Sequence, residues 1–272
     1  MGIIYGNGGF VKSRRNRLDP DALAFIARVE LADGQPLEAG VKDAMNTLIS
    51  GLKSDGILPL IKSCCLLAGA GTLNGALVQL IPNANPVTNI DFNPADYNRT
   101  LGLKGDGTSK RILTNRANNA DPQNSNHNAV FVTESGGSQS FAFMGSGASA
   151  TGNRNLLWSN GNLLFASRQN SSFPEITGQG VTTGFKGFSR TTATLTTCRT
   201  GGVNYTDNTF SGVPTADSIS IFAFTAPSAD FFNSGRLSFF SIGEALLTEG
   251  IGLALLDTRI TTYMNTLASL NL

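Results

Sequence analysis

Near the start of the chain, apolar residues recur every three or four positions, which is the spacing of one face of an α-helix. The first such stretch follows Asp19-Pro20, a dipeptide typical of a helix N-terminus because Asp accepts a free backbone N–H and Pro fits the first turn. It carries Leu23, Ile26 and Val29 on one face and closes at Asp33-Gly34. A second stretch closes at Asp55-Gly56, and its apolar face consists of Leu37, Val41, Met45, Leu48 and Leu52. The pattern predicts a helical hairpin whose apolar stripes pack on another part of the protein.

Between residues 73 and 241 the pattern changes to short apolar or alternating runs, many of them rich in Val, Ile, Phe and Thr, which favour strands. Hairpin turns are predicted at Gly105-Asp106-Gly107, Asn160-Gly161 and Thr200-Gly201-Gly202. Eleven short strands without helices between them favour an antiparallel sandwich over a parallel α/β sheet. The runs are 76–81, 100–103, 110–113, 129–133, 140–144, 155–158, 162–166, 185–190, 193–199, 218–224 and 235–242.

Helical spacing returns at the end of the chain. Thr248 can cap this helix and Glu249 suits its positive end. Its apolar stripe consists of Leu253, Leu256, Ile260, Tyr263, Leu267 and Leu270. We expect the stripe to pack with the N-terminal helices against one side or edge of the sandwich. The predicted organisation is an arm over residues 1–18, a helical segment over 19–72, and a β-sandwich domain over 73–272 that includes the C-terminal helix.

Composition narrows the class of protein. The 272 residues contain 20 Lys and Arg against 19 Asp and Glu, and charged residues make up only 14%. Capture of nucleic acid or of an anionic membrane needs a strong excess of Lys and Arg, so neither partner is expected. No run of about 18 apolar residues predicts a membrane-spanning helix, and the first residues lack the order of a secretion signal. Adjacent Cys64 and Cys65 do not suit a disulfide framework, which favours synthesis in a reducing compartment.

A basic cluster precedes the first helix, and it consists of Lys12, Arg14, Arg15 and Arg17. These side chains could dock on an acidic surface of a partner or touch nucleic acid. A solvated, flexible tail explains four charges equally well. We take the cluster as a candidate docking segment for a partner protein.

Residue patterns for catalysis are absent from the sequence. His127 is the single histidine, and we expect it to lie near the start of a strand rather than to act as a base. No pair of acids alternates on a strand, as the two carboxylates of a glycoside hydrolase could, although acids distant in sequence can still meet. One His and three Cys cannot assemble a convincing zinc site. We therefore predict no catalytic residues and no cofactor, and a non-enzymatic protein.

Calcium is harder to exclude, because Asp, Asn and backbone carbonyls suffice to bind it. Asp91, Asn93 and Asp96 lie close together, but the EF-hand order is missing. Turns in which Asx side chains bond to the backbone explain these residues at least as well. Structural calcium therefore stays open, with no metal ligand assigned.

Aromatic residues in turn-rich segments offer a way to bind sugars, because an exposed ring can stack on a sugar face while Asn, Ser and Thr bond to hydroxyl groups. The alternative is that most of these rings fill the sandwich core. We single out Phe173, Tyr205 and Phe210 as candidate glycan contacts. The group from which they come is Phe173, Phe185, Phe188, Tyr205, Phe210, Phe231 and Phe232.

Taken together, the order of segments resembles that of tailed-bacteriophage virion proteins that carry a concanavalin A-like (lectin or laminin-G type) jelly roll between short terminal helices. The first segments that carry the resemblance are the helix that begins Asp19-Pro20-Asp21-Ala22 and the helix around Ala44-Met45-Asn46. Thr100–Lys110 follows, in which Gly105-Asp106-Gly107-Thr108 is similar to the family's Gly-Asp-Gly-Thr hairpin. The last segments are Gly187-Phe188-Ser189-Arg190, before the turn at Thr200, and Arg236–Leu246. This resemblance implies an antiparallel jelly-roll β-sandwich with an N-terminal helical hairpin and a C-terminal helix.

The resemblance also implies a place on the virion surface after synthesis in the host cytoplasm, often in homo-oligomers, with other virion proteins as partners. Our leading interpretation is an adhesin-type module of a tail, fibre or baseplate, which binds the host surface, with a glycan as candidate ligand, or other virion proteins. A head decoration or head-fibre protein is a close alternative, and a glycan-degrading hydrolase of the virion is a more distant one. The resemblance carries no catalytic residues.

Overall fold

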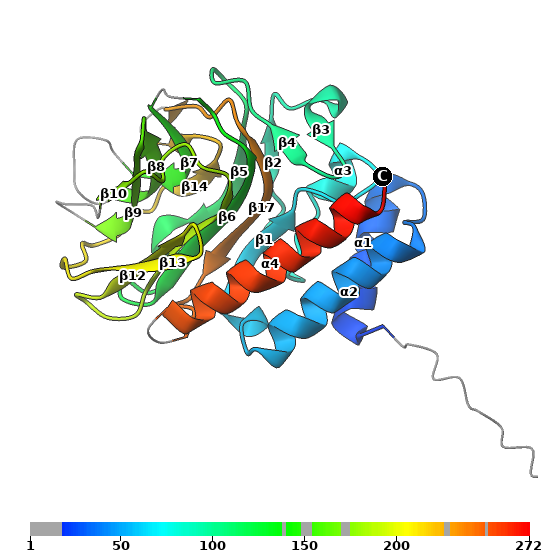
Figure 1. The fold of residues 1–272 in the computed structure, drawn as a ribbon, viewed down its shortest axis with the longest axis horizontal. Helices are drawn as coiled ribbons and strands as arrows, with labels where there is room; N and C mark the ends of the chain where they lie inside the picture. The colour runs from blue at the N-terminus through cyan, green and yellow to red at the C-terminus, as the bar shows by residue number, and fades with distance from the viewer. Residues whose placement is uncertain (1–17, 138–139, 148–153, 170–174, 226–228, 248–249) are drawn as a thin grey trace, which may run out of the picture.

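The computed structural model describes residues 18–137, 140–147, 154–169, 175–225, 229–247 and 250–272. Two antiparallel sheets stack face to face, and a layer of helices covers the outer face of one of them (Figure 1). The predicted β-sandwich with an N-terminal helical hairpin and a C-terminal helix is therefore confirmed. Residues 1–17 of the predicted arm, with Lys12, Arg14, Arg15 and Arg17, lie outside the described residues, as does the predicted cap at Thr248 and Glu249.

The N-terminal hairpin forms where the sequence predicts it. Helix α1 (Pro20–Asp33) begins after Asp19, whose side chain accepts the backbone N–H of Asp21, and it ends at Gly34 in the left-handed conformation. Helix α2 spans Ala39–Ser54. One residue of the predicted stripe was wrongly placed: Leu23 is exposed, and Phe25 takes a buried position instead. The apolar spacing of α1 fits two faces, so periodicity alone could not choose between them.

Sheet A has the order β13-β12-β11-β6-β17-β4-β3, and β1 also pairs with β17. Strand β17 lies between β6 on one side and both β4 and β1 on the other. The strands are β1 (Ile61–Leu66), β3 (Tyr97–Asn98), β4 (Gly102–Lys104), β6 (Asn126–Glu134), β11 (Gly184–Arg190), β12 (Thr196–Thr200), β13 (Val203–Asp207) and β17 (Arg236–Gly243).

Sheet B has the order β10-β9-β8-β7-β14-β5-β2. Its strands are β2 (Thr88–Ile90), β5 (Arg111–Ala117), β7 (Ser140–Ser146), β8 (Arg154–Asn160), β9 (Leu163–Gln169), β10 (Glu175–Thr177) and β14 (Ser218–Ile221). A separate ribbon is formed by β15 (Phe224–Thr225) and β16 (Ala229–Asp230). Short helical turns are η1 (Leu58–Leu60), α3 (Leu73–Ala76), η2 (Pro94–Asp96) and η3 (Asn118–Ala120).

Two of the three predicted hairpin turns are confirmed. Asn160-Gly161 joins β8 to β9, and Thr200-Gly201-Gly202 joins β12 to β13. The turn predicted at Gly105-Asp106-Gly107 is instead a crossover, because β4 belongs to sheet A and β5 to sheet B. The run 76–81 does not form the predicted strand: α3 ends at Ala76, and only an isolated bridge joins Gln79 to Cys65.

Two large apolar cores follow from this layering. One lies between the sheets, where Val130 and Phe240 of sheet A meet Phe143 and Leu157 of sheet B. The other lies between sheet A and the helices, and it includes Phe239 of β17. Side chains alternate between faces of a strand, so neighbouring residues 239 and 240 enter different cores. Sheet A is thus covered on both faces.

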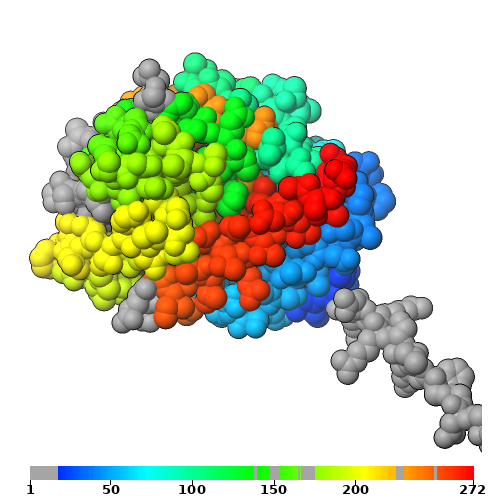
Figure 2. Space-filling view, viewed as in Figure 1, coloured from blue at the N-terminus to red at the C-terminus, as the bar shows by residue number. Residues whose placement is uncertain are grey.

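Helix α4 (Ile251–Ser269) closes the helical core beside α2. The two helices run as adjacent diagonal bands across one face of the molecule (Figure 2). The predicted stripe is buried from Leu253 to Leu267. The Tyr263 hydroxyl donates to the carbonyl oxygen of Ala68 at 2.9 Å, and Arg259 forms an ion pair with Asp55 at 2.8 Å. Among the described residues, no helix is long and apolar enough to cross a membrane.

Candidate functional site

The three predicted glycan contacts have different outcomes. Phe173 lies outside the described residues. Tyr205, on β13, is half-buried and packs against the core between the sheets. Phe210, in the 208–217 connection between β13 and β14, is 73% exposed. Phe210 is thus the described member of the three that offers a free ring.

The loop that carries Phe210 is held by Arg190. The Arg190 side chain is buried, and its guanidinium donates to the carbonyl oxygens of Thr192, Ala193 and Thr209 at 3.1–3.3 Å. Burial lowers the pKa of this guanidinium below its ordinary value. The backbone N–H of Ser211 also donates to the carbonyl oxygen of Ala193 at 2.8 Å. Phe210 therefore projects from a loop that is fixed at its base.

A larger aromatic group gathers on the outer face of sheet B, the face turned away from sheet A. Strand β8 alternates, so Leu157 enters the core between the sheets while Leu156 and Trp158 face outward. The β15–β16 ribbon folds over this face and adds Phe224 and Phe231. The rings of Trp158 and Phe231 meet edge to face, with centroids 5.7 Å apart and planes at 63°.

These side chains border a small hollow of about 160 Å³, which we call the aromatic hollow. Its lining consists of Arg154, Leu156, Trp158, Phe224 and Phe231. Trp158 and Phe231 are half-buried, so part of each ring reaches the surface. Phe231 is fixed from below, because its carbonyl oxygen accepts the backbone N–H of Ala142 in β7 at 2.7 Å.

A second hollow of about 390 Å³, the acidic hollow, shares Phe231 with the first. It is lined by Asp106, Gly107, Gly136, Ser140, Phe141, Asp230, Phe231, Phe232 and Ser234. Carboxylates and hydroxyls therefore stand beside aromatic rings across one continuous surface. We call the two hollows together the aromatic surface.

The two carboxylates of the acidic hollow differ in the hydrogen bonds that they accept from their own chain. Asp106 accepts the backbone N–H groups of Thr108, Ser109 and Lys110 at 2.9–3.1 Å. Burial opposes its ionised form, but these bonds outweigh burial and hold the pKa of Asp106 well below its ordinary value. Asp230 is exposed and accepts one local bond, from the backbone N–H of Phe231 at 2.7 Å. Asp106 thus shapes the loop, and Asp230 is the carboxylate open to a ligand.

The residues considered for calcium are taken up by local bonds. Asn93 and Asp96 form a reciprocal capping box at η2, and Asp96 also forms an ion pair with Lys110 at 2.7 Å. Asp91 lies in the left-handed conformation, which suits a turn. Within the described ranges, no group of three His, Cys, Asp or Glu side chains could hold a metal ion.

The three cysteines and the single histidine are all buried. Cys64, Cys65 and Cys198 are buried free thiols, and burial raises the pKa of each. His127 lies at the second position of β6, as predicted, and is buried with both ring nitrogens engaged. None of the four lines either hollow of the aromatic surface.

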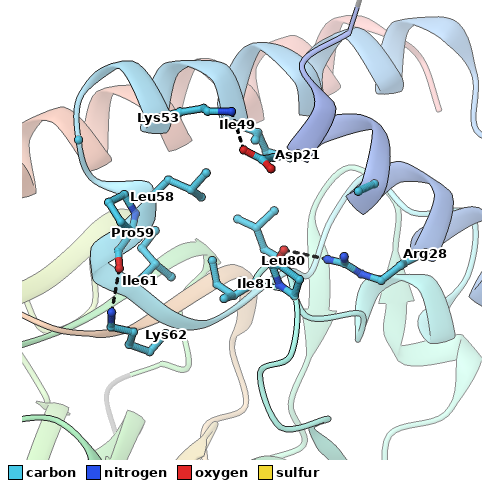
Figure 3. A pocket seen from close by; sticks show the side chains of 13 residues that line it. Asp21, Arg28, Ile49, Lys53, Leu58, Pro59, Ile61, Lys62, Leu80 and Ile81 are labelled. Atoms are coloured by element: carbon cyan, nitrogen blue, oxygen red, sulfur yellow. Dashed lines mark hydrogen bonds and ion pairs between the residues drawn. The ribbon is translucent and has the colours of Figure 1, made fainter.

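A third hollow, of about 560 Å³, lies in the helical layer (Figure 3). The side chains that point toward it are those of Leu58, Ile61, Leu80 and Ile81, which come from η1, β1 and the segment after α3. Arg28 of α1 borders its other side. We call it the helical hollow. Its wall is mostly apolar.

Comparisons with known proteins identify the fold rather than a family. No family model matches the chain. A search of curated proteins found no match either. Among solved structures, the binding domain of botulinum neurotoxin serotype D superposes with a TM-score of 0.51 and 13% identity, over 74% of this chain and 50% of that one.

Two further structures are similar over smaller parts. A mutant of NanB sialidase from Streptococcus pneumoniae matches with a TM-score of 0.43 and 12% identity, over 55% of this chain and 26% of that one. The enzymatically active domain of bacteriophage CBA120 tailspike protein 2 matches with a TM-score of 0.39 and 15% identity, over 60% and 27%. The chain spans about a quarter to a half of the length of these proteins. The likeness to the toxin domain supports the β-sandwich, and the phage family remains a prediction.

Sequence reasoning found part of the aromatic surface and missed its centre. Phe231 and Phe232 stand in the wider aromatic group, but Trp158 does not. Trp158 lies in the middle of a strand, which in a sandwich indicates a core residue. The usable signal is alternation: Leu157 is fully buried, so its neighbour Trp158 faces outward, on a sheet whose outer face none of the described helices covers.

Proposed function

We propose that this protein is a non-enzymatic binding module displayed on a bacteriophage virion, and that its aromatic surface holds a glycan of the host. The observation that carries the proposal is the half-buried pair of Trp158 and Phe231, set beside the open carboxylate of Asp230. Rings offer a stacking face to the C–H groups of a sugar, and Asp230 and Ser140 offer acceptors and donors to its hydroxyls.

The form of this surface suits an extended, mostly neutral chain of sugars. The two hollows share Phe231, so one ligand can lie across both. Arg154 lines the aromatic hollow, and Asp106 and Asp230 line the acidic hollow, so the surface carries one cation and two carboxylates. An apolar ligand would displace water from these polar groups without replacing its hydrogen bonds, which costs binding free energy.

The place on the virion rests on the resemblance stated for the sequence and on the low charge of the chain. Polar, weakly charged contacts depend little on salt, which suits a particle that meets varied media. Immunogold electron microscopy of purified phage tests this point. Label on the tail or fibres supports the adhesin, label over the head supports the alternative of a decoration protein, and unlabelled particles would exclude a virion role.

Glycan binding is tested on the isolated chain with an array of host-surface glycans, followed by calorimetric titration of the best ligand. We expect Trp158→Ala and Phe231→Ala each to weaken binding by about 2- to 12-fold, since aromatic contacts contribute roughly 0.5–1.5 kcal/mol beyond the area that they bury. Phe210→Ala is the matched control: it also removes an exposed ring, but one outside the aromatic surface. A loss with Phe210→Ala alone would transfer the site to the 208–217 loop.

A hydrolase is the second candidate, because Asp106 and Asp230 line the same hollow. Glycoside hydrolysis needs one carboxyl group that keeps its proton near neutral pH. The lowered pKa of Asp106 makes it unsuited to that part. We therefore expect no release of reducing ends from any bound glycan. Turnover by the wild type that Asp230→Asn abolishes would overturn the non-enzymatic proposal.

A further inference from the structure

Helix α1 is apolar on two faces. One face enters the helical core through Ala22, Phe25, Ile26 and Val29. The other is turned to solvent, where Leu23 is 55% and Leu31 is 84% exposed. Its remaining exposed apolar residues are Pro20, Ala24 and Ala27. Isolated exposed Leu residues are common, but two on one uncharged helix face indicate an interaction surface. We call Pro20, Leu23, Ala24, Ala27 and Leu31 the α1 face.

The charges of α1 do not interrupt this face, because each is engaged within its own chain. The contacts are Asp21 with Lys53 at 2.6 Å, Glu30 with Lys42 at 2.6 Å, Arg28 with the carbonyl oxygens of Gln79 and Leu80, and Asp33 with the backbone N–H groups of Gly71 and Thr72. A partner of high charge would find no complementary group here. The face suits a partner that is itself apolar and uncharged.

Hollows border α1 where its N-terminal half crosses α2. Ala24 and Arg28 line the helical hollow (Figure 3). A fourth hollow, of about 720 Å³, also borders α1, and we call it the α1 hollow. Its lining includes Leu18, Pro20 and Leu23, with Asn46 and Ser50 of α2. Helix α1 is therefore a ridge with depressions beside it. Helices pack by laying the ridges of one into the grooves of the other, so this relief suits a second helix.

Three residues of the α1 face, Leu23, Ala27 and Leu31, have the same order from either end of the helix. Leu23 stands four residues before Ala27, and Leu31 stands four residues after it. A two-fold axis at Ala27 would bring Leu23 of one copy against Leu31 of the other, twice, with the small Ala27 side chains at the crossing. Antiparallel helices also set their dipoles in opposite directions, which is favourable. An isologous contact needs this kind of self-complementary patch.

We propose that two copies of this chain associate through the α1 face, with their α1 helices antiparallel about Ala27. The proposal does not depend on glycan binding. Helix α1 lies at the end of the molecule opposite β8 and β9 (Figure 1), so the contact leaves the aromatic surface of each copy free. Closure by a two-fold axis also ends the assembly at two copies, because each α1 face is then covered.

The first experiment is the mass of the full chain in solution by sedimentation equilibrium. We expect about twice 28.5 kDa for the wild type and 28.5 kDa for Leu31→Glu, because a buried carboxylate at the contact is unfavourable. Val203→Glu is the matched control, since Val203 is a similarly exposed apolar residue on β13, away from α1, and it should leave the dimer intact. A monomeric wild type at about 50 μM, or a Leu31→Glu dimer, would overturn the proposal.

Cross-linking tests the direction of the two helices. Cys64, Cys65 and Cys198 are buried, so a cysteine introduced on α1 is the accessible thiol. Ala27→Cys should form a disulfide-linked dimer under mild oxidation, because a disulfide needs Cα atoms within about 7 Å. Leu23→Cys and Leu31→Cys should link to each other when mixed, but not to themselves. Self-linking at 23 and at 31 would indicate parallel helices and contradict the antiparallel contact.

A different segment that could cover the α1 face belongs to the same chain. Residues 1–17 precede Leu18, which lines the α1 hollow. Deletion of 1–17 separates the two cases. If a second copy covers the α1 face, the shortened chain stays dimeric. A monomeric full chain that becomes dimeric after the deletion would assign the face to the arm and contradict our proposal.

Discussion

The Nδ1 atom of His127 lies 2.6 Å from the backbone carbonyl oxygen of Glu244. A carbonyl oxygen accepts, so Nδ1 carries the proton and Nε2 accepts from the Ser241 hydroxyl at 2.7 Å. The ring is fully buried and neutral, and burial lowers the pKa of His127 to about 4. It fastens the segment after β17, which leads to α4, onto β6.

This geometry predicts a loss of stability in mild acid. The unfolded chain takes up a proton at His127 near pH 6.5, but the folded chain does so only near pH 4. Between these values the unfolded state binds more protons, so the free energy of unfolding falls as the pH falls. We expect it to be about 2 kcal/mol lower at pH 5 than at pH 7, measured by urea denaturation. His127→Gln should be less stable at pH 7 but nearly flat over this range; an unchanged slope in that variant would assign the effect to other groups.

A second prediction concerns Arg190. Replacement by Met removes the donors to the carbonyl oxygens of Thr192, Ala193 and Thr209, and should lower the free energy of unfolding by roughly 2 kcal/mol. Limited proteolysis should then cut the 208–217 loop faster. Lys62→Met is the control, because its ion pair with Glu244 is partly exposed and should cost less than about 1 kcal/mol. Equal protease resistance in wild type and Arg190→Met would show that other contacts hold the loop.

Helix α4 depends in part on one hydroxyl. Tyr263→Phe leaves the buried carbonyl oxygen of Ala68 without its donor and should cost about 1–2 kcal/mol of stability, read from thermal and urea unfolding. Gly69, next to Ala68, has a φ of 99°, and a Cβ there would collide with the Tyr263 hydroxyl. Gly69→Ala should therefore cost more than Tyr263→Phe. Tyr205→Phe, on β13, should change stability by less than about 0.5 kcal/mol.

The salt dependence of glycan binding gives a further check on the aromatic surface. Stacking on Trp158 and Phe231 involves little net charge, so affinity should change by less than about twofold between low and high NaCl. Titration calorimetry at two salt concentrations measures this. A tenfold loss at high salt would indicate an ionic contact instead, and Arg154 would be the first residue to replace.

The sequence predicts the elements well where a single pattern decides them. Asp19 and Gly34 bound α1 because a cap and a left-handed residue each have a local chemical reason. Strand β1 was missed, because Ile61–Leu66 is an apolar run beside predicted helices and its partner β17 is distant in sequence. The crossover after Gly105 was mistaken for a hairpin for the same reason: turn chemistry is local, whereas the choice of sheet is not.

The candidate site was less predictable than the fold. An exposed ring such as Phe210 can be guessed from its turn-rich surroundings. Trp158 and Phe231 are brought together only when β8 lies in sheet B and the β15–β16 ribbon folds across it. Likewise, α1 carries apolar residues on two faces, and only packing shows that Phe25 is covered while Leu23 is open. Both surfaces are products of tertiary structure.

Strand β17 also sets the order in which the chain can fold. It fills the place between β6 on one side and β1 and β4 on the other, and Ile61 pairs with Gly243. During synthesis, β1 and β6 are complete long before residues 236–243 leave the ribosome. Until then β6 presents an unpaired edge, which is a site for pairing with other chains. Closing so long a loop is slow, so sheet A should form late and be the step at which premature termination or crowded expression leads to aggregation.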